Sequence, residues 1–151
     1  MHGCIMAIVA LDKIDEMWQS DSKIDSTEPG TEILRIPVLH AKYIQQIMSH
    51  SLMIKRLMIE YNNMRKLRVD YYNGRMDKDQ LRQLGWSQFG FVLKSDINVY
   101  LDADPELSKI KAKMVPHEEA VSYCNLVVKE LNARTYQLRA YCDWEKFVAG
   151  K

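Results

Sequence analysis

The sequence predicts a mainly α-helical protein in which long helices pair as a helical hairpin or a small bundle. The two residue types that interrupt helices are scarce, with 4 Pro and 6 Gly among 151 residues. Residues 38–73 contain neither of them. In the last third of the chain, apolar residues recur with the seven-residue spacing of coiled coils. These three observations favour packed helices over a strand-and-turn architecture.

The length and composition are those of a single folded domain, residues 1–151. Hydrophobic residues make up 47% of the chain and charged residues 27%, so one core is expected. The three cysteines, Cys4, Cys124 and Cys142, are widely spaced without a CxxC pair, which favours a reducing cytosol and no metal site. The N-terminal apolar run is too short for a membrane span and lacks the basic flank of a signal peptide. A start of translation at Met6 is an alternative.

Residues 1–37 are expected to form an acidic N-terminal arm with one short helix. The helix is predicted by apolar residues at helical spacing, Leu11, Ile14, Met17 and Trp18. It is too short to be stable alone and must dock on another element. From residue 19 to 37 the polar residues, Pro and Gly predict a connector, with its clearest turn at Glu28-Pro29-Gly30. Pro37 is then expected to prepare the start of the next helix.

Residues 38–74 are predicted to form one long basic helix that ends at Gly74. Such a helix would be roughly 52 Å long, whereas a compact domain of this size is only about 38 Å across. We therefore expect it to protrude or to pack against other subunits. His50 and Arg68 are the only polar residues of its coiled-coil-like seam, which otherwise consists of Tyr43, Ile47, Ile54, Leu57, Tyr61, Met64 and Tyr71.

A connector is expected over residues 75–103. Its first part, residues 75–93, is polar and aperiodic and predicts an ordered loop. Asp96 can cap a short turn that runs through Leu101. Asp104-Pro105 then combines an N-cap residue with Pro at the first helical position, which predicts the start of a second long helix.

Residues 104–151 are predicted to be the C-terminal oligomerisation helices. Pro116 removes a backbone donor, so a kink, or two helices that meet there, is expected. Two seams on one small chain suggest an antiparallel helical core that also joins subunits. One seam contains Leu107, Met114, Val121, Val128, Thr135 and Cys142, and the other Ile110, His117, Cys124, Leu131, Leu138 and Glu145.

The charge of the chain is unevenly distributed although its net value is only +1. Residues 1–34 have seven acids against two Lys, a net charge of −5, and residues 55–75 have six bases against two acids, a net charge of +4. Within the basic stretch, cations that suit phosphates lie beside rings on which bases can stack, as single-stranded nucleic acid requires. The alternative is a solvated basic helix end with Tyr71 and Tyr72 in the core, and composition alone favours this alternative. The candidate DNA-binding residues are Arg65, Lys66, Arg68, Tyr72 and Arg75.

Catalytic and cofactor motifs are missing from the sequence, so neither an enzyme nor a cofactor is expected. There is no Gly-rich phosphate loop, nucleophile elbow or Cys/His dyad. His40, His50 and His117 have no metal ligand at suitable spacing on their own helix faces. Residues 102–105 resemble part of a calcium loop, but helix capping explains them better. A metal-dependent nuclease that uses the acids of the arm is a weaker alternative.

Several strings of residues are weak signals singly but specific in their order and spacing. They are Leu11-Asp12 through Met17-Trp18, Asp21-Ser22 and Ile24-Asp25; residues 39–43; Arg68 with Val69-Asp70-Tyr71-Tyr72-Asn73-Gly74; residues 100–104; residues 132–137; and Trp144, Phe147, Ala149 and Gly150. In this pattern the chain resembles the UvsY family, the recombination mediators of T-even-type phages and of related phages of marine cyanobacteria. The resemblance extends almost from end to end. The extra N-terminal residues and Pro116 depart from the family pattern.

The resemblance implies a ring-like homo-oligomer, a heptamer in the family, in the cytoplasm of an infected bacterium. Its implied partners are single-stranded DNA, a phage RecA-like recombinase and the phage single-strand-binding protein, and its implied role is to help load the recombinase. The resemblance implies DNA contact at Lys66 and Arg68, whereas charge and stacking alone add Arg65, Tyr72 and Arg75. Arg68 also lies on the helix seam, so the seam is expected to open before that residue.

A coiled-coil structural or scaffold protein without a DNA-binding role, for instance a virion component, is the alternative function. In such a protein the basic segment would be only a solvent-exposed helix end. The two hypotheses differ in whether the oligomer binds single-stranded DNA.

Overall fold

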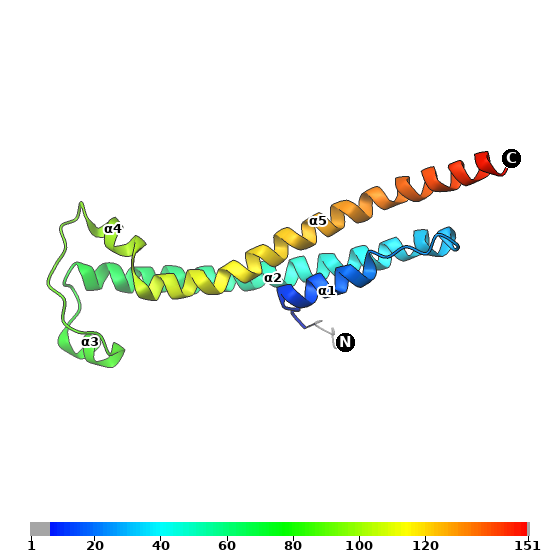
Figure 1. Ribbon diagram of the computed structural model, residues 1–151. Coiled ribbons are helices and arrows are strands. Elements are labelled where there is room, and N and C mark those ends of the chain that lie inside the picture. Colours follow the sequence, from blue (N-terminus) through cyan, green and yellow to red (C-terminus); the bar gives the residue numbers. More distant parts are fainter. Residues whose placement is uncertain (1–6, 151) are drawn as a thin grey trace. The chain divides into compact units, whose positions relative to one another are not determined.

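The computed structural model describes residues 7–150, which form five helices and no strand (Figure 1). Cys4 and Met6 lie outside the described residues. The helices are α1 (Leu11–Asp21), α2 (Pro29–Tyr72), α3 (Lys78–Leu84), α4 (Ile97–Asp102) and α5 (Pro105–Val148). The predicted mainly α-helical class is confirmed. None of the helices in this part of the chain is long and apolar enough to cross a membrane.

The chain divides into two compact units, and both long helices contribute to each. The first, which we call the terminal unit, comprises residues 1–53 and 116–151, and the second, the central unit, comprises residues 54–115. Each unit has its own cluster of buried apolar side chains, whereas composition predicts one core.

The core of the terminal unit contains side chains from α1, α2 and α5. Ile14 of α1, Tyr43 of α2 and Leu131 of α5 are fully buried in one cluster. Trp18 packs edge-on against Tyr43, with ring centroids 5.7 Å apart. The predicted docking of the short N-terminal helix is therefore confirmed, and the helix continues three residues beyond Trp18, to Asp21.

The start of α2 corrects the predicted connector. The helix begins at Pro29, so the Glu-Pro-Gly sequence is its first turn, and Pro37 lies inside it. Pro29 suits a first helical position, where an amide hydrogen would have no partner. Pro37 removes one helical hydrogen bond, at a cost of about 3 kcal/mol or more. Burial of the neighbouring Ile36 and Leu39 side chains, worth roughly 1.5–3 kcal/mol each, offsets this cost.

Asp21, the last residue of α1, joins this helix to α2. Its carboxylate accepts hydrogen bonds from Lys42 Nζ at 2.7 Å and from the Tyr43 hydroxyl at 2.9 Å. Arg35 Nη2 lies 3.4 Å from the other carboxylate oxygen. Burial alone would raise the pKa of Asp21, but these hydrogen bonds and charges outweigh burial, and the pKa lies below its ordinary value.

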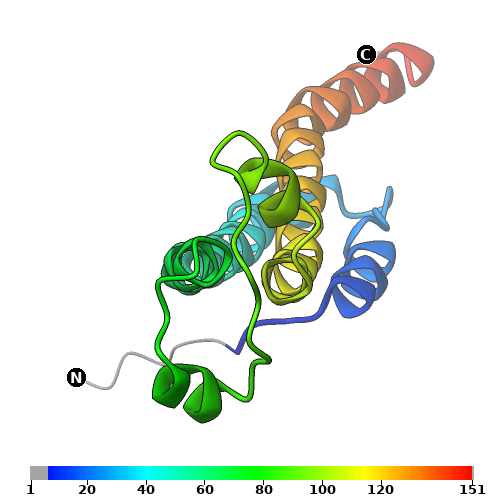
Figure 2. The same ribbon diagram turned by 90° about the vertical axis from the view of Figure 1, so that its left-hand side faces the viewer.

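In the central unit, α2 and α5 run antiparallel. Lys113 Nζ lies 3.8 Å from a Glu60 carboxylate oxygen, and Lys111 Nζ lies 5.4 Å from the centre of the Tyr61 ring. The shorter α3 and α4 lie on opposite sides of the end of α2 (Figure 2). The antiparallel helix pair that the sequence predicts is present here.

The connector corrects the prediction of a loop at 75–93, because it contains α3. The Asp77 carboxylate accepts a hydrogen bond from the backbone N–H of Gln80 at 2.7 Å, and the side-chain oxygen of Gln80 accepts one from the backbone N–H of Asp77 at 3.2 Å. These two bonds form a complete capping box. A helix of seven residues is too short for an apolar repeat, so periodicity could not find it. The predicted turn through Leu101 is α4, but the Asp96 side chain makes no capping hydrogen bond to it.

The long helix α5 passes through Pro116 without a break, so the expectation of two helices is wrong. The Ile110, Cys124, Leu131 and Leu138 positions of one predicted seam are buried, and His117 is half-buried. The other seam is buried only at Leu107 and Met114. Beyond Pro116, the buried residues of this second seam lie one position earlier than predicted, at Ala120, Val127 and Arg134. Of the predicted seam residues in this part of the helix, Thr135 and Glu145 are exposed. The Arg134 guanidinium lies 5.4 Å from the Trp18 ring, an attraction that an apolar pattern does not reveal.

The outer face of α2 in the terminal unit bears an apolar stripe of Leu34, Val38, Met48 and Leu52, all of them exposed. At 100° per residue, these four positions fall within about 80° of one another. They lie on the opposite side of the helix from the buried Leu39, Tyr43 and His50. The stripe thus has no partner within the described residues of this chain.

Candidate nucleic-acid interface

The five predicted DNA-binding residues fall into two groups. Arg65, Lys66 and Arg75 are exposed around the end of α2. Arg68 and Tyr72 are buried, with exposed fractions of only 8% and 6%. The sequence places all five residues on one segment, but only Arg65, Lys66 and Arg75 present a charge to solvent.

Arg68 and Tyr72 belong to a hydrogen-bonded network centred on Asp104. Arg68 Nε donates to Asp104 Oδ2 at 2.6 Å, and the Tyr72 hydroxyl donates to the same oxygen at 2.6 Å. Arg68 Nη2 also donates to the Tyr72 hydroxyl at 3.2 Å. The second oxygen, Asp104 Oδ1, accepts from the amides of Glu106 and Leu107, at 2.9 and 3.0 Å. Asp104 therefore caps α5, as predicted, and also links it to the end of α2.

The pKa values within this network favour the ionised pair. Burial alone would raise the pKa of Asp104, but hydrogen bonds from Tyr72, from the Leu107 amide and from Arg68 outweigh it, and the pKa is lowered. Burial opposes the charge of Arg68 as well, but the hydrogen bonds to Asp104 and Tyr72 raise its pKa. The buried charges are thus compensated inside the network.

The Arg68 guanidinium is also enclosed by aromatic rings. Its central carbon lies 4.4 Å from the centre of the Tyr71 ring and 4.5 Å from that of Trp86. Trp86 and Phe89 of the connector in turn pack on Tyr71, at 5.3 and 5.5 Å. Arg68 is thus a central contact between the helix end and the connector.

These contacts correct the expectation that the seam opens before Arg68. In the single chain the side chain is enclosed, and it points to Asp104 and the aromatic rings. Sequence reasoning named Asp104 only as a cap and did not single out Trp86 as a partner. Because Asp104 lies 36 positions from Arg68, no local spacing signal could pair them.

The exposed cations lie in the central unit, which has a net positive charge. Residues 54–115 contain twelve Lys and Arg against eight Asp and Glu, a net charge of +4. Arg65, Lys66 and Arg75 form no ion pair with another described residue. Their charges are therefore free to attract phosphates.

The histidines and the cysteine that could take part in chemistry are held in packing contacts of the terminal unit. His50 and His117 contact each other, with 2.8 Å between their Nδ1 atoms. Burial raises the pKa of the Cys124 thiol to about 11, so the reactive thiolate is disfavoured. Residues 7–150 contain no group of three His, Cys, Asp or Glu side chains that could hold a metal ion.

Known proteins match this chain over most of its length. The model of the family described as "Recombination, repair and ssDNA binding protein UvsY" matches residues 17–151. The recombination protein uvsY of Enterobacteria phage T4 is 24% identical over 141 residues, which cover 93% of this chain and 98% of that protein.

Solved structures support the same relationship. Two crystal structures of the bacteriophage T4 recombination mediator protein UvsY, in lattice types II and IV, match with TM-scores of 0.82 and 0.81. They are 23% and 22% identical to this chain, cover 93% and 92% of it, and are themselves covered to 98% and 99%. At this identity they establish a shared fold. The family match over residues 17–151 shows that the chain belongs to the UvsY family of recombination, repair and single-stranded DNA-binding proteins.

Proposed function

We propose that the protein is a recombination mediator that binds single-stranded DNA as a homo-oligomer and promotes loading of a phage recombinase onto DNA covered by single-strand-binding protein. The observation that carries this proposal is the family match over residues 17–151. The setting would be the cytoplasm of the infected bacterial host. No step of the proposed role requires catalysis or a cofactor.

In this proposal, Arg65, Lys66 and Arg75 contact the DNA phosphates directly. They are exposed and have no acidic partner among residues 7–150, so neutralising phosphates would cost them no ion pair that this part of the chain forms. Arg68 and Tyr72 support the site by holding the connector against the end of α2. If Arg68 also touches DNA, it must first leave Asp104.

The apolar stripe on α2 supports the homo-oligomer. An exposed row of Leu34, Val38, Met48 and Leu52 is costly in water, and a second copy of the chain would cover it. A ring, heptameric as the family resemblance implies, would repeat the basic segment around one DNA strand. Avidity would then supply the affinity that a single segment lacks. The acidic residues 1–34 are a candidate contact for the recombinase or the single-strand-binding protein.

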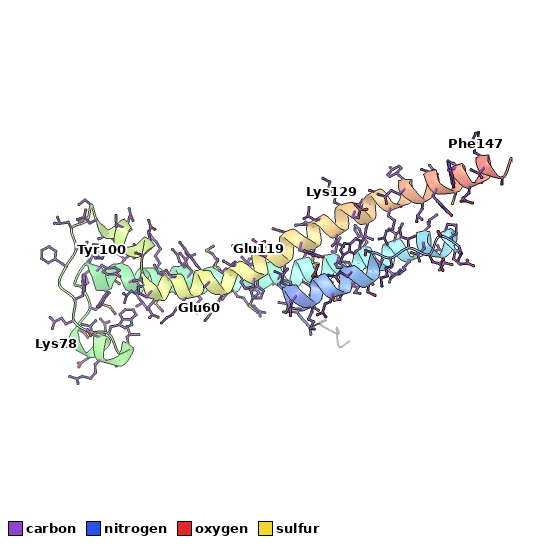
Figure 3. All side chains as sticks on the ribbon, viewed as in Figure 1. Glu60, Lys78, Tyr100, Glu119, Lys129 and Phe147 are labelled. Atoms are coloured by element: carbon purple, nitrogen blue, oxygen red, sulfur yellow. The ribbon has the colours of Figure 1, made fainter. Side chains whose placement is uncertain are left out.

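DNA binding can be tested with the double variant Arg65→Ala/Lys66→Ala and a fluorescent oligo(dT) titrated at several salt concentrations. We expect weaker binding and a salt slope that falls by about 1.4, since each phosphate contact on a single strand contributes about 0.7. The matched control is Lys129→Ala/Arg139→Ala, which removes two exposed cations from α5; Figure 3 labels Lys129. An unchanged affinity and slope in the first variant would show that the contact lies elsewhere.

The mediator role needs a second measurement. Recombinase filaments should assemble faster on DNA that is covered with single-strand-binding protein when the wild-type protein is added, and the double variant should lose this effect.

The rival hypothesis, a coiled-coil scaffold protein, is favoured by the same apolar stripe. It predicts an oligomer whose mass in solution does not change when single-stranded DNA is added.

A further inference from the structure

A pocket of about 320 Å³ lies beyond the end of α2, in the central unit. Its lining combines two cations, one aromatic ring, one amide and two apolar side chains: Arg75, Lys94, Phe91, Asn73, Val92 and Leu93. Among them, the sequence analysis named only Arg75 as a candidate DNA-binding residue. This volume is at the small end of the range for ligand pockets in proteins.

Phe91 is the aromatic residue of the connector whose ring is available for stacking on a ligand. Its side chain is 76% exposed. In contrast, Trp86, Phe89 and Tyr100 all pack on other rings of the same unit. A phenyl ring with a free face is a platform on which any nucleobase can stack.

Arg75 and Lys94 give the pocket a positive charge. Both are exposed, and neither forms an ion pair with a described residue. The nearest acid in sequence to Lys94, Asp96, accepts a hydrogen bond from the Ser95 hydroxyl. Two unpaired cations beside one ring match the phosphates and the base of a nucleotide in a single strand.

The partial negative charge at the end of α2 is reduced here, because the last carbonyls of the helix accept hydrogen bonds. The Tyr72 carbonyl accepts from the Val92 amide at 2.9 Å, and the Asp70 carbonyl accepts from the Arg75 amide at 2.9 Å. The Tyr71 carbonyl accepts from the Gly74 amide at 3.2 Å. These bonds satisfy the helix end and also hold Arg75 near residues 91–93 of the connector.

Gly74 sets the shape of the pocket. Its φ of +67° is a left-handed conformation that favours glycine. A Cβ at this position would lie 3.4 Å from the Gly90 carbonyl oxygen and 3.7 Å from Phe91 Cβ. The close approach of the two segments therefore exists before any ligand binds.

We propose that this pocket is a nucleotide subsite for single-stranded DNA, in which Phe91 stacks on a base while Arg75 and Lys94 contact the adjoining phosphates. This inference rests on the proposed function, because it places the strand that Arg65 and Lys66 attract. It adds a contact to the base, whereas the exposed cations of α2 contact only the backbone. Stacking on Phe91 tolerates every base, as a protein without sequence preference requires.

The test compares the full-length protein with Phe91→Ala, Phe91→Trp and Arg75→Ala/Lys94→Ala. Each binds two fluorescent probes of equal length, oligo(dT) and an abasic strand that has the same phosphates but no bases. The matched control is Phe147→Ala, which removes a ring that is 81% exposed at the end of α5 (Figure 3). Thermal melting confirms that each variant is folded.

We expect Phe91→Ala to bind oligo(dT) about tenfold more weakly with an unchanged salt slope, and to bind the abasic strand like the wild type. Phe91→Trp should retain oligo(dT) binding, and its added fluorescence should be quenched by the probe. Arg75→Ala/Lys94→Ala should lower the slope by about 1.4 on both probes.

Equal binding of oligo(dT) by Phe91→Ala and the wild type would overturn the subsite. If Arg65→Ala/Lys66→Ala still weakened binding, the proposed function would stand and only the subsite would fail. If the wild type bound neither probe at low salt, both proposals would fail together. A loss in Phe147→Ala as large as that in Phe91→Ala would also overturn the subsite, since any exposed ring would then suffice.

Discussion

The two units each bury one arginine against aromatic rings, but they satisfy its charge differently. In the central unit, Arg68 pairs with the Asp104 carboxylate at 2.6 Å. In the terminal unit, Arg134 donates to the backbone carbonyls of Asp21 and Ser22, at 3.3 and 3.0 Å, and its Nε has no hydrogen-bond partner. Burial lowers the pKa of Arg134, whereas hydrogen bonds overcome burial and raise that of Arg68.

This difference corresponds to what each arginine holds in place. Arg134 satisfies carbonyls at the end of α1, next to an apolar core that already joins three helices. Arg68 joins the end of α2, the start of α5 and the connector, and fewer fully buried apolar residues surround it. The central unit should therefore depend more on a single ion pair than the terminal unit does.

The largest effect is expected from Asp104→Ala. The substitution leaves Arg68 buried without a counter-charge and removes the cap of α5, so the free energy of unfolding should fall by about 3–5 kcal/mol. Urea denaturation measures the change. Asp102→Ala, at an exposed position two residues earlier, is the control. A loss below about 1 kcal/mol would mean that the network does not hold the central unit together.

Arg134→Met should cost less, about 1–3 kcal/mol, because the methionine keeps most of the apolar volume but leaves two carbonyls without their donor. The same denaturation experiment applies, with the exposed Arg139→Met as the control. If Arg134→Met destabilises the protein more than Asp104→Ala does, the contrast between the units is reversed.

Gly74→Ala tests the connector without touching any charge. The left-handed backbone conformation should cost about 1–2 kcal/mol with a Cβ present. Gly30→Ala is the control, because a Cβ there has nothing within 4 Å. We also expect weaker oligo(dT) binding by Gly74→Ala, because relief of the backbone strain at residue 74 would move Arg75 relative to Phe91. Unchanged stability and unchanged binding would together contradict this account of the pocket.

The smallest effect is a pH dependence confined to the terminal unit, because residues 54–115 contain no histidine. His50 Nε2 donates to the Val9 carbonyl at 2.9 Å, so when the His50 ring is neutral its Nδ1 accepts from His117 Nδ1. Burial, together with the charge of His50, holds the pKa of His117 below its ordinary 6.5. The unfolded chain then binds more protons, and stability should be complete above pH 6.5 and fall as the pH drops below it.

Urea denaturation at pH 7 and pH 5 measures this loss. His117→Gln should abolish the difference between the two pH values, whereas His40→Gln, which removes a histidine outside the pair, should retain it. A pH dependence that survives in His117→Gln would point to other groups.

Much of the architecture was predictable because helices depend on local residues. Apolar spacing in α1, the absence of Pro and Gly over 38–73, and Asp104-Pro105 at the start of α5 all predicted elements that are present. The capping box of Asp77 and Gln80 was a further local signal that could have revealed α3. The start of α2 at Pro29 was harder to predict from the sequence, since it depends on burial of Ile36 and Leu39 against other elements.

The sequence by itself determined the helical class, the uneven charge, and the basic segment that contains Arg65, Lys66 and Arg75, because composition and short-range spacing are sufficient for these. Only the tertiary structure decided that Arg68 and Tyr72 turn inward to Asp104, and that Phe91 and Lys94 join Arg75 at one pocket. Arg68 and Tyr72 lie 36 and 32 positions from Asp104, and Phe91 and Lys94 lie 16 and 19 positions from Arg75. At such separations the geometry of the folded backbone, and not sequence spacing, determines which side chains meet.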